Sequence, residues 1–431
     1  MAAPPGWTQL RYRWASGTGT WAQARQWLAS APGRRFENRR FGTAEHLLSI
    51  VYQGFPEGLI YVMPYLRDQQ VALAGTVNQA DPVDGVDVAD VADTVDGAPV
   101  SWRGVRRSAH APEADILVVG CSRRRALGLP RERSVLLPFR VHMLLDVVGD
   151  AETMHRSVSA NERRQFARLR REHGWTCEIG TRVDDLRFFY DRMHLPTMAT
   201  RHGEETRSTD WDIALRALFR RGMVLFVREG GRRVAGVLCR LEDDGRTLRM
   251  RLLGVLDGDE AHYRSGAVKA VYYLTMEWAA GNGVTRIDFS GGDPFPGKGV
   301  FQFKRRFHPT IAHPADHFGD RRVYVQVARD TAAVRDFLVA TPMFTVDDSD
   351  RLVATHFFDG VRPPRRSVRA DGPGVHASRD VDLDVFLAGL APPAVPAGGI
   401  GRTAAADPVV ADPAVSGVPG GESPARQVIG R

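Results

Sequence analysis

The order of the predicted elements between residues 223 and 307 constrains the fold of this chain more than any other feature. Three strand-like apolar runs follow one another, and turn-forming Gly and Asp residues separate them. A long amphipathic helix comes next, and a short strand then leads into a glycine-rich loop and a basic segment. This succession predicts a mixed α/β unit built on a largely antiparallel sheet. The elements are expected over 223–228, 233–241, 247–255, 266–280, 286–289, 290–299 and 300–307.

The segment before this unit contains a helix with clear start and stop signals. Ser159 and Glu162 have the spacing of a capping box, and Gly174 stands where a helix usually ends. Five arginines lie between these signals, with few acidic residues to offset them. Such a face is usually solvated, although it also suits a polyanion, and both interpretations stay open. Further helices are expected over 182–200 and 209–221.

The first part of the chain gives shorter signals. Aspartate recurs at every third position over 81–98, a spacing that fits neither a strand nor a helix, so we expect an exposed insertion there. Near the other end Pro, Gly, Ala and Val dominate, which predicts disorder, with 381–390 docked on the folded body. Strands are expected over 59–63, 71–74, 116–119, 135–137 and 141–148.

These patterns predict a chain of five parts. Two folded halves are joined by a basic helix and a connecting strand, and an extension and a tail follow them. We expect an N-terminal half at 1–150 that includes the insertion, the connection at 151–181, a C-terminal half at 182–330, an extension at 331–370 and a mostly disordered tail at 371–431.

Composition places the chain among globular proteins of a reducing compartment. Hydrophobic residues make up 43% and charged residues 25%, which is enough apolar surface for a sizeable core. The three cysteines are widely spaced and form no CxxC pair, so we expect neither a disulfide framework nor a metal site. The sequence has no signal peptide and no apolar run long enough for a transmembrane segment. We therefore expect a cytoplasmic protein, for which peripheral contact with a membrane stays open.

The basic residues are almost all arginine. The chain has a formal charge of +7, and its acidic residues concentrate in the insertion and the tail, so the rest should carry a positive field that favours polyanionic partners. Only three of the 58 basic residues are lysine, namely Lys269, Lys298 and Lys304. An ammonium is a flexible point charge that a planar guanidinium does not replace. We therefore expect at least one of these lysines to act in function.

The stretch from Val224 to Phe307 resembles the GNAT superfamily of acyltransferases, and within it the FemAB-like branch. The resemblance rests on the paired strands, the helix that ends in a Trp-Ala step, the short strand closing in Asp and the ending VFQFKRRF. Upstream, RSVSANERRQFARLRREHGW resembles the basic helix of that branch, and FFYDRMHLPTMATRHG resembles the helix before its second half. Over about residues 115–310, the resemblance implies an α/β (α+β) fold: mixed, largely antiparallel sheets flanked by helices, with two GNAT-type halves in tandem.

The resemblance also implies a cofactor site before the helix 266–280. In GNAT enzymes, amides at the start of the corresponding helix hold the pyrophosphate of coenzyme A. Here Arg264, Ser265, Gly266 and Ala267 offer a charge, a helix cap and a close backbone approach. Lys298 in the glycine-rich loop is a second candidate contact. We expect acyl-CoA, most simply acetyl-CoA, as co-substrate and no metal, while an ordinary helix cap remains the alternative for these residues.

The catalytic candidates are a cation and several proton acceptors. Lys304 matches the position where FemAB-like transferases resemble one another in placing a cation near the reacting carbonyl. An ammonium there stabilises a developing oxyanion by on the order of 3 kcal/mol. The alternative is that Lys304 belongs to a solvated basic helix end. Candidates for the base that takes the amine proton are His202, Glu205 and Asp288.

Substrate contacts are expected from the upstream helix and from the residue before the catalytic lysine. The residues concerned are Tyr190, His194, Arg201 and Phe303. The sequence thus predicts an N-acyltransferase that acts on a primary amine of a small molecule or a cell-envelope (cell-wall) precursor. An aminoacyl-tRNA-dependent FemAB-type transferase, with tRNA as partner, is the first alternative. A non-catalytic basic module that binds RNA or a membrane surface is the second.

Overall fold

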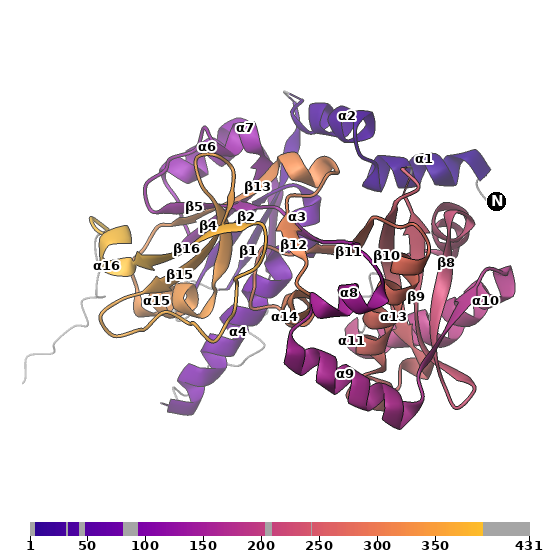
Figure 1. Cartoon of the computed structure of the whole chain (residues 1–431). Coiled ribbons are helices and arrows are strands. Elements are labelled where there is room, and N and C mark those ends of the chain that lie inside the picture. Colours follow the sequence, from indigo (N-terminus) through magenta and orange to yellow (C-terminus); the bar gives the residue numbers. More distant parts are fainter. Residues whose placement is uncertain are drawn as a thin grey trace, which may run out of the picture. The chain divides into compact units, whose positions relative to one another are not determined.

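The computed structural model describes residues 5–31, 33–42, 48–80, 94–202, 209–242 and 244–390. Within these ranges, three β-sheets are flanked by helices (Figure 1). Neighbouring strands are mostly antiparallel, and each sheet contains one parallel pair. The mixed α/β fold with largely antiparallel sheets, as predicted from the sequence, is confirmed.

The first sheet has the strand order β3-β1-β2-β4-β13-β5, and one of its inner strands comes from a distant part of the chain. β13 (Arg321–Val327) lies between β4 (Ile116–Ser122) and β5 (Ser134–Pro138) and is antiparallel to both. Every residue of β4 and β13 is buried, as in strands covered on both faces. The remaining strands are β1 (Arg35–Phe41), β2 (Ile50–Gly54) and β3 (Thr94–Ser101).

The second sheet has the order β12-β6-β11-β10-β9-β8-β7 and carries the candidate site. β6 (Val141–Asp146) enters this sheet from the first part of the chain and pairs with β11 (Arg286–Gly292) and β12 (Thr310–Ala312). The long helix α13 (Ala267–Gly281) packs against the middle of the sheet and buries most of its residues. The other strands are β7 (Thr176–Gly180), β8 (Gly222–Glu229), β9 (Arg232–Leu241) and β10 (Thr247–Val255).

A small third sheet and the helices complete the described structure. The third sheet has the order β14-β15-β16, with β14 (Met343–Val346), β15 (Leu352–Phe358) and β16 (Val375–Asp382). The α-helices besides α13 are α1 (Pro5–Ser16), α2 (Thr20–Ala29), α3 (Pro56–Tyr61), α4 (Met63–Ala80), α6 (Trp102–His110), α7 (Arg123–Ala126), α8 (Ala151–Arg156), α9 (Ala160–His173), α10 (Val183–Phe189), α11 (Leu195–His202), α12 (Glu260–Arg264), α14 (Gly299–Lys304), α15 (Ala332–Ala340) and α16 (Leu383–Phe386). Two π-helical segments, η1 (Tyr190–His194) and η3 (Ile213–Leu218), and four 3-10 turns, η4 (Phe219–Arg221), η5 (Leu256–Gly258), η6 (Arg305–Phe307) and η7 (His317–Asp320), connect them.

The predicted strands 223–228, 233–241 and 247–255 and the helix 266–280 are confirmed within one residue at each end, and the helix after Ser159 is confirmed too. The strand predicted over 286–289 continues to Gly292, into the predicted loop. Ser159 Oγ accepts the Glu162 N–H at 3.4 Å, and Gly174 ends α9 in the left-handed region, at a φ of 62°. The carboxylate of Glu162 does not close the predicted capping box. It accepts a hydrogen bond from Lys269 Nζ at 2.6 Å and so ties α9 to α13.

Two predicted strands are wrong, since residues 59–63 and 71–74 lie in α3 and α4. Pro56 occupies the first turn of α3, where its missing N–H costs nothing. In α4, Met63, Leu66 and Gln70 are buried at helical spacing. A run of four or five apolar residues is too short to distinguish this period from that of a buried strand.

The two large sheets exchange a strand across the predicted boundary near residue 150. β6 lies before that boundary but belongs to the second sheet, and β13 lies beyond it but belongs to the first. Part of the predicted tail is ordered, because β16 pairs in parallel with β15. Leu383 and Leu387 are buried in the first core, as expected for a docked 381–390 segment. Residues 94–98 of the predicted insertion lie in β3, whereas 81–93 and 391–431 are outside the described residues.

Candidate active site

Strands β10 and β11 run together only at their beginnings and then separate. Their parallel pairing extends from Thr247 and Arg286 to Arg249 and Asp288, although both strands continue beyond that pair. Each strand also has an irregularity there. The register of β11 against β6 shifts after Asp288, and the register of β10 against β9 shifts after Met250. Bulges of this kind re-aim side chains and release backbone groups from the ladder. The two strands therefore form a V with Asp288 at its vertex.

The carboxylate of Asp288 is almost fully buried, with 1% exposure, and is surrounded by donors. Its Oδ2 accepts a hydrogen bond from Arg249 Nε at 2.7 Å and lies 3.3 Å from His142 Nδ1. Its Oδ1 accepts the Ser290 N–H at 2.7 Å. Burial alone raises the pKa of Asp288, but the His142 hydrogen bond, the charges of His142 and Arg249, and the Ser290 amide together hold that pKa well below its usual range. A carboxylate in this state is a poor proton acceptor and suits an orienting role.

His142 lies beside this carboxylate and was not among the residues predicted from the sequence. β6 pairs it with Gly291, and it is 7% exposed. A carboxylate on Nδ1 fixes the imidazole orientation and leaves Nε2 as the nitrogen that can accept a proton. The sequence did contain a signal, because Arg140 and His142 are polar residues two apart in the apolar run 135–148. In a strand, that spacing puts both side chains on one face.

Lys304 turns inward at the end of α14. Its side chain is buried, and Nζ donates to the carbonyl oxygen of Phe289 at 2.6 Å. Burial lowers the pKa of Lys304 to about 8, against the opposing charge of Asp288. The alternative of a solvated helix end is therefore wrong for Lys304, whereas its neighbour Arg306 is exposed. An ammonium beside the vertex of the V is positioned to stabilise negative charge there.

Lys298 contributes to the same group of charges. Its Nζ forms an ion pair with Asp293, whose charge also acts on Lys304. The structure therefore associates Lys298 with Lys304 and Asp288 through Asp293. The third lysine, Lys269, binds Glu162 and Gln165 of α9 and has a structural role.

The start of α13 differs from the prediction in one contact. Gly266, not Ser265, is the residue that caps the helix, and its φ of 91° belongs to the left-handed region that favours glycine. The hydroxyl of Ser265 donates to the His262 carbonyl at 3.1 Å, so the predicted serine cap is wrong. Arg264 is exposed and Ala267 is buried. The features of an anion site that remain are the exposed guanidinium and the free amides of the first turn of α13.

The π-helical segment η1 lies on the part of β10 beyond the vertex. Gly254 of β10 lets it approach closely, because a Cβ there would lie 2.7 Å from His194 N and 2.6 Å from Met193 O. His194 is buried with its Nδ1 3.2 Å from the Leu253 carbonyl, and burial lowers its pKa. Its Nε2 has no hydrogen-bond partner within the described part of the chain. Tyr190 packs nearby, so both residues lie along the open arm of the V.

The other predicted substrate and base residues lie elsewhere or are not described. Phe303 packs in an aromatic cluster with Tyr272, at 5.1 Å between ring centroids, and with Phe307. Glu205 and the side chains of Arg201 and His202 lie outside the described residues. The described residues contain no group of three or more His, Cys, Asp or Glu side chains arranged to hold a metal ion.

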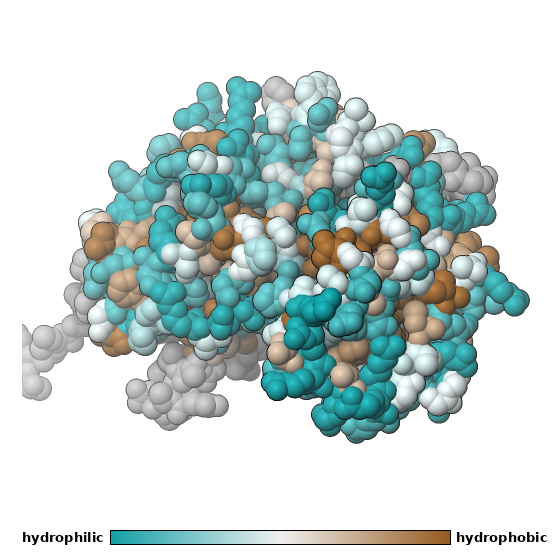
Figure 2. All heavy atoms as spheres, viewed as in Figure 1, coloured by the Kyte–Doolittle hydropathy of each residue, from teal (hydrophilic) through white to brown (hydrophobic). Residues whose placement is uncertain are grey.

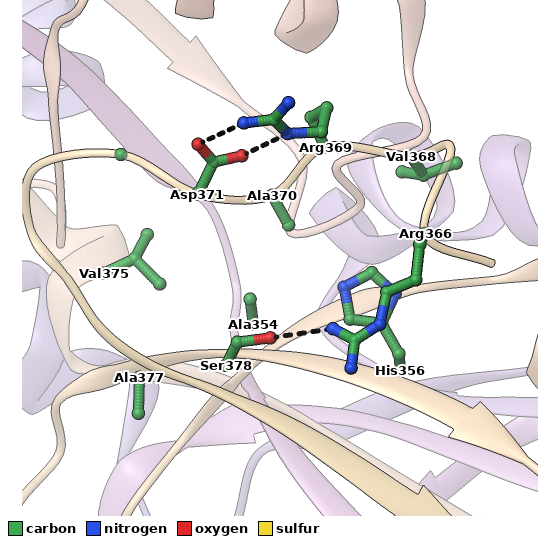
Figure 3. Close-up of a pocket in the computed structure, with 11 residues that line it drawn as sticks. Ala354, His356, Arg366, Val368, Arg369, Ala370, Asp371, Val375, Ala377 and Ser378 are labelled. Carbon is green, nitrogen blue, oxygen red and sulfur yellow. Dashed lines mark hydrogen bonds and ion pairs between the residues drawn. The ribbon is translucent and has the colours of Figure 1, made fainter. Parts of the chain in front are cut away.

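A pocket of about 430 Å³ that the sequence did not predict opens between β15, β16 and the loop that precedes β16 (Figure 3). Its arginines already have acidic partners, which are Asp371 for Arg369 and, outside the lining, Asp380 for Arg366. Arg369 holds Asp371 through two hydrogen bonds of 2.8 and 2.9 Å, and Arg366 reaches Ser378 at 3.3 Å. The loop is tied to α14 because Gln302 donates to the Arg369 carbonyl at 2.7 Å. The loop that lines this pocket is therefore attached to the helix that carries Lys304.

Comparisons with known proteins identify the domain that carries the site. Residues 156–305 match the family model described as an acetyltransferase (GNAT) domain. Among solved structures, the chain is similar to L-PGS from Bacillus licheniformis, with 10% identity over 78% of this chain and 96% of that chain and a TM-score of 0.34. It is also similar to FemX, with 12% identity over 76% and 96% and a TM-score of 0.35. No curated protein matches the sequence.

The family match includes the elements whose motifs resemble the superfamily. It contains Asp288 and Lys304 and the helix start at Gly266, whereas His142 lies before it. Residues 156–305 thus match the model of a GNAT acetyltransferase domain, which confirms the predicted resemblance to the GNAT superfamily over that part of the chain.

Proposed function

We propose that this protein transfers an acyl group from an acyl-CoA to a primary amine at the vertex of the V between β10 and β11. The observation that carries the proposal is the convergence of His142, Asp288 and Lys304 at the point where the two strands part. An oriented imidazole and a buried ammonium are the two groups that aminolysis of a thioester needs. A bound acyl-CoA would supply the thioester carbonyl that the amine attacks.

In this proposal His142 is the general base. Its Nε2 takes the proton that the amine nitrogen loses as the new C–N bond forms, and Asp288 stabilises the resulting imidazolium through Nδ1. Lys304 stabilises the negative oxygen of the tetrahedral intermediate. When the C–S bond breaks, the thiolate leaves and takes the proton from the His142 imidazolium, so charge and protons balance and His142 is neutral again. Arg249 donates to the same oxygen of Asp288, Oδ2, and holds the carboxylate in position.

The donor would be held by the first turn of α13. Gly266 caps this turn in the left-handed region, and the exposed Arg264 adds a positive charge beside it. His194 and Tyr190, on the open arm of the V, are the proposed acceptor contacts. The acceptor in this proposal is a small molecule or a cell-envelope precursor that carries a primary amine.

A second candidate donor is an aminoacyl-tRNA, and one surface feature favours it. Arg164, Arg168 and Arg171 of α9 are exposed, and the surface over α9 is strongly hydrophilic (Figure 2). The three side chains are spaced by three and four residues, so they share one face of the helix. A row of guanidinium groups suits the phosphates of a nucleic acid. Binding of such a donor would fall steeply with salt, whereas binding of acetyl-CoA would change little.

Turnover by wild-type protein and by two site variants tests the proposal. With acetyl-CoA and a panel of primary amines, we expect thiol release by the wild type and a loss of about a hundredfold or more for Lys304→Ala and for His142→Gln. His110→Gln, which changes an exposed histidine of α6, should keep full activity. Equal turnover by all three variants would reject these catalytic roles. An inactive wild type that binds charged tRNA but not acetyl-CoA would support the second donor, and RNA or lipid binding without any turnover would support a non-catalytic module.

A further inference from the structure

Helix α1 buries polar side chains and exposes its large apolar ones. Thr8 and Tyr12 are 2% and 3% exposed and face the protein. Trp7, Leu10 and Trp14 are 61%, 47% and 38% exposed. They are spaced by three and four residues, so they form one stripe along the helix. This is the reverse of the pattern expected for a helix whose outer face meets only water.

The contacts of the inner face explain its polar character. Tyr12 lies under the guanidinium of Arg240, with 4.3 Å between the cation and the ring centroid. Gln9 Nε2 donates to the Arg216 carbonyl at 2.8 Å, which attaches α1 to η3. The inner face therefore packs on charged and polar groups of the second sheet and of η3. The outer stripe plays no part in that attachment.

Helix α2 also exposes large apolar side chains. Trp27 is 76% exposed and Leu28 is 42% exposed. Four of the eight tryptophans of the chain lie between residues 7 and 27. Figure 1 shows both helices, in indigo, along the outer edge of the described structure. Scattered single apolar residues need no explanation, but several large ones on consecutive helices indicate an interaction surface.

The charge of this segment indicates what the surface meets. Residues 1–36 contain five arginines and no acidic residue. Tryptophan combines an apolar ring with an N–H donor and prefers the interface between lipid and water. A helix that presents tryptophan and leucine beside arginine is typical of peptides that lie in the headgroup region of anionic bilayers. No helix in the described residues is long and apolar enough to cross a membrane.

We propose that α1 and α2 dock this protein on the surface of an anionic phospholipid membrane, with the stripe Trp7, Leu10 and Trp14 inserted at the interface. The inference does not depend on the proposed acyl transfer, because it rests on side chains that face away from the V. Its failure would leave the proposed reaction unaffected. Its success would place the site of that reaction in a protein held beside lipid headgroups.

The test is sedimentation of the full chain with vesicles. Vesicles of phosphatidylcholine alone are compared with vesicles of phosphatidylcholine and phosphatidylglycerol, and tryptophan emission is recorded in parallel. We expect binding to the anionic vesicles with a blue shift of the emission. The triple variant Trp7→Ser, Leu10→Ser, Trp14→Ser should bind at least roughly tenfold more weakly, because the apolar insertion is lost. Circular dichroism and thermal unfolding of the variant establish that its fold is intact.

A control variant separates this surface from general stickiness. Val361→Ser and Val385→Ser together remove two other exposed apolar side chains, which are 85% and 74% exposed, and should leave vesicle binding unchanged. Absence of wild-type binding to anionic vesicles would overturn the proposal. So would equal binding by the triple variant, since charge alone would then explain the attachment. Light scattering covers the remaining case: a wild-type dimer that the triple variant loses, without vesicle binding, would assign the stripe to a second copy of the chain.

Discussion

Lys304 and Asp288 are neighbouring ionisable residues whose states are set by different effects. Desolvation dominates at Lys304 and lowers its pKa to about 8, whereas nearby donors dominate at Asp288 and lower its pKa as well. The first shift opposes the charged form and the second favours it. The candidate site therefore holds one charge that its surroundings destabilise, the Lys304 ammonium, and one that they stabilise, the Asp288 carboxylate. Of these two groups, only Lys304 can change its protonation state near neutral pH.

The buried ammonium of Lys304 should support turnover but lower the free energy of unfolding. Below a pH of about 8 the folded protein keeps a buried ammonium whose pKa lies below its ordinary 10.5, which costs on the order of 3 kcal/mol by linkage. Lys304→Met should therefore abolish turnover and yet raise the free energy of unfolding at neutral pH. The gain should shrink between pH 8 and 10.5, where Lys304 is neutral when folded but still protonated when unfolded.

Urea unfolding of the wild type and of Lys304→Met at several pH values checks this prediction. The difference between the two curves is the readout, so the pH response of other groups cancels. A variant that is less stable than the wild type throughout the range would contradict it. That result would mean that the hydrogen bond to the Phe289 carbonyl outweighs the desolvation of the ammonium.

Removal of the Asp288 charge should have the opposite effect and lower the free energy of unfolding. Asp288→Asn removes the closer of two carboxylates paired with the buried Arg249, because Glu242 remains 3.2 Å away, and it also removes the partner of His142. Loss of a charge from this buried group should cost about 3 kcal/mol. Asp146→Asn is the matched control, since Asp146 of β6 pairs with Arg286 of β11 at 2.9 Å but at the surface. That change should cost less than about 1 kcal/mol. Denaturant unfolding of both variants measures the contrast, and similar losses would contradict the buried pair.

The sequence predicted two residues of this site and missed two others, for a physical reason. Asp288 and Lys304 lie in a continuous motif that the resemblance covers. His142 and Arg249 reach Asp288 from two other strands, so only the register of β6 and β10 against β11 brings them together. Single residues such as these carry no signal of their own in the sequence. For His142, the only signal in the sequence is that it interrupts an apolar run with a polar residue.

Elements with strong local signals were predicted well, and those without them were not. α9 has a serine at its start and a glycine at its end, and the strands β8, β9 and β10 are separated by turn residues. By contrast, α3 and α4 present short apolar runs whose helical period is visible only over their whole length. The π-helical form of η1 was also beyond sequence reasoning, because it depends on how closely that segment packs on β10.

The close packing of η1 on β10 predicts that one methyl group added at Gly254 will destabilise the protein. Gly254→Ala would put a Cβ 2.5 Å from the Met193 carbonyl carbon, a clash with backbone that no side-chain rotation relieves. We expect a loss of at least about 2 kcal/mol of unfolding free energy and displacement of His194 from β10. Gly281→Ala is the control, since a Cβ there meets open space at the end of α13. Thermal unfolding of both variants is the measurement, and a stable Gly254→Ala protein would contradict the described packing.

For the whole molecule, the exchanged strands predict that the two halves do not fold separately. A fragment 1–150 would lack β13 and would carry β6 without its partner β11. A fragment 151–393 would lack β6 and would carry β13 without its partners β4 and β5. We expect each fragment alone to lack cooperative thermal unfolding, and co-expression to restore it. Circular dichroism of the separate and combined fragments measures this. A cooperatively folded single fragment would show that the exchange is dispensable.

The position of β13 between β4 and β5 also has a consequence for synthesis of the chain. About 200 residues separate the end of β4 from the start of β13, and at ribosomal rates they take roughly 10–40 s to make. Throughout that interval, the edge of β4 stays unpaired and its apolar side chains stay uncovered, because β13 has not yet been synthesised. The nascent chain thus exposes an unpaired, fully apolar strand edge for many seconds. Its safe maturation should depend on a chaperone that occupies this edge until residue 327 has emerged.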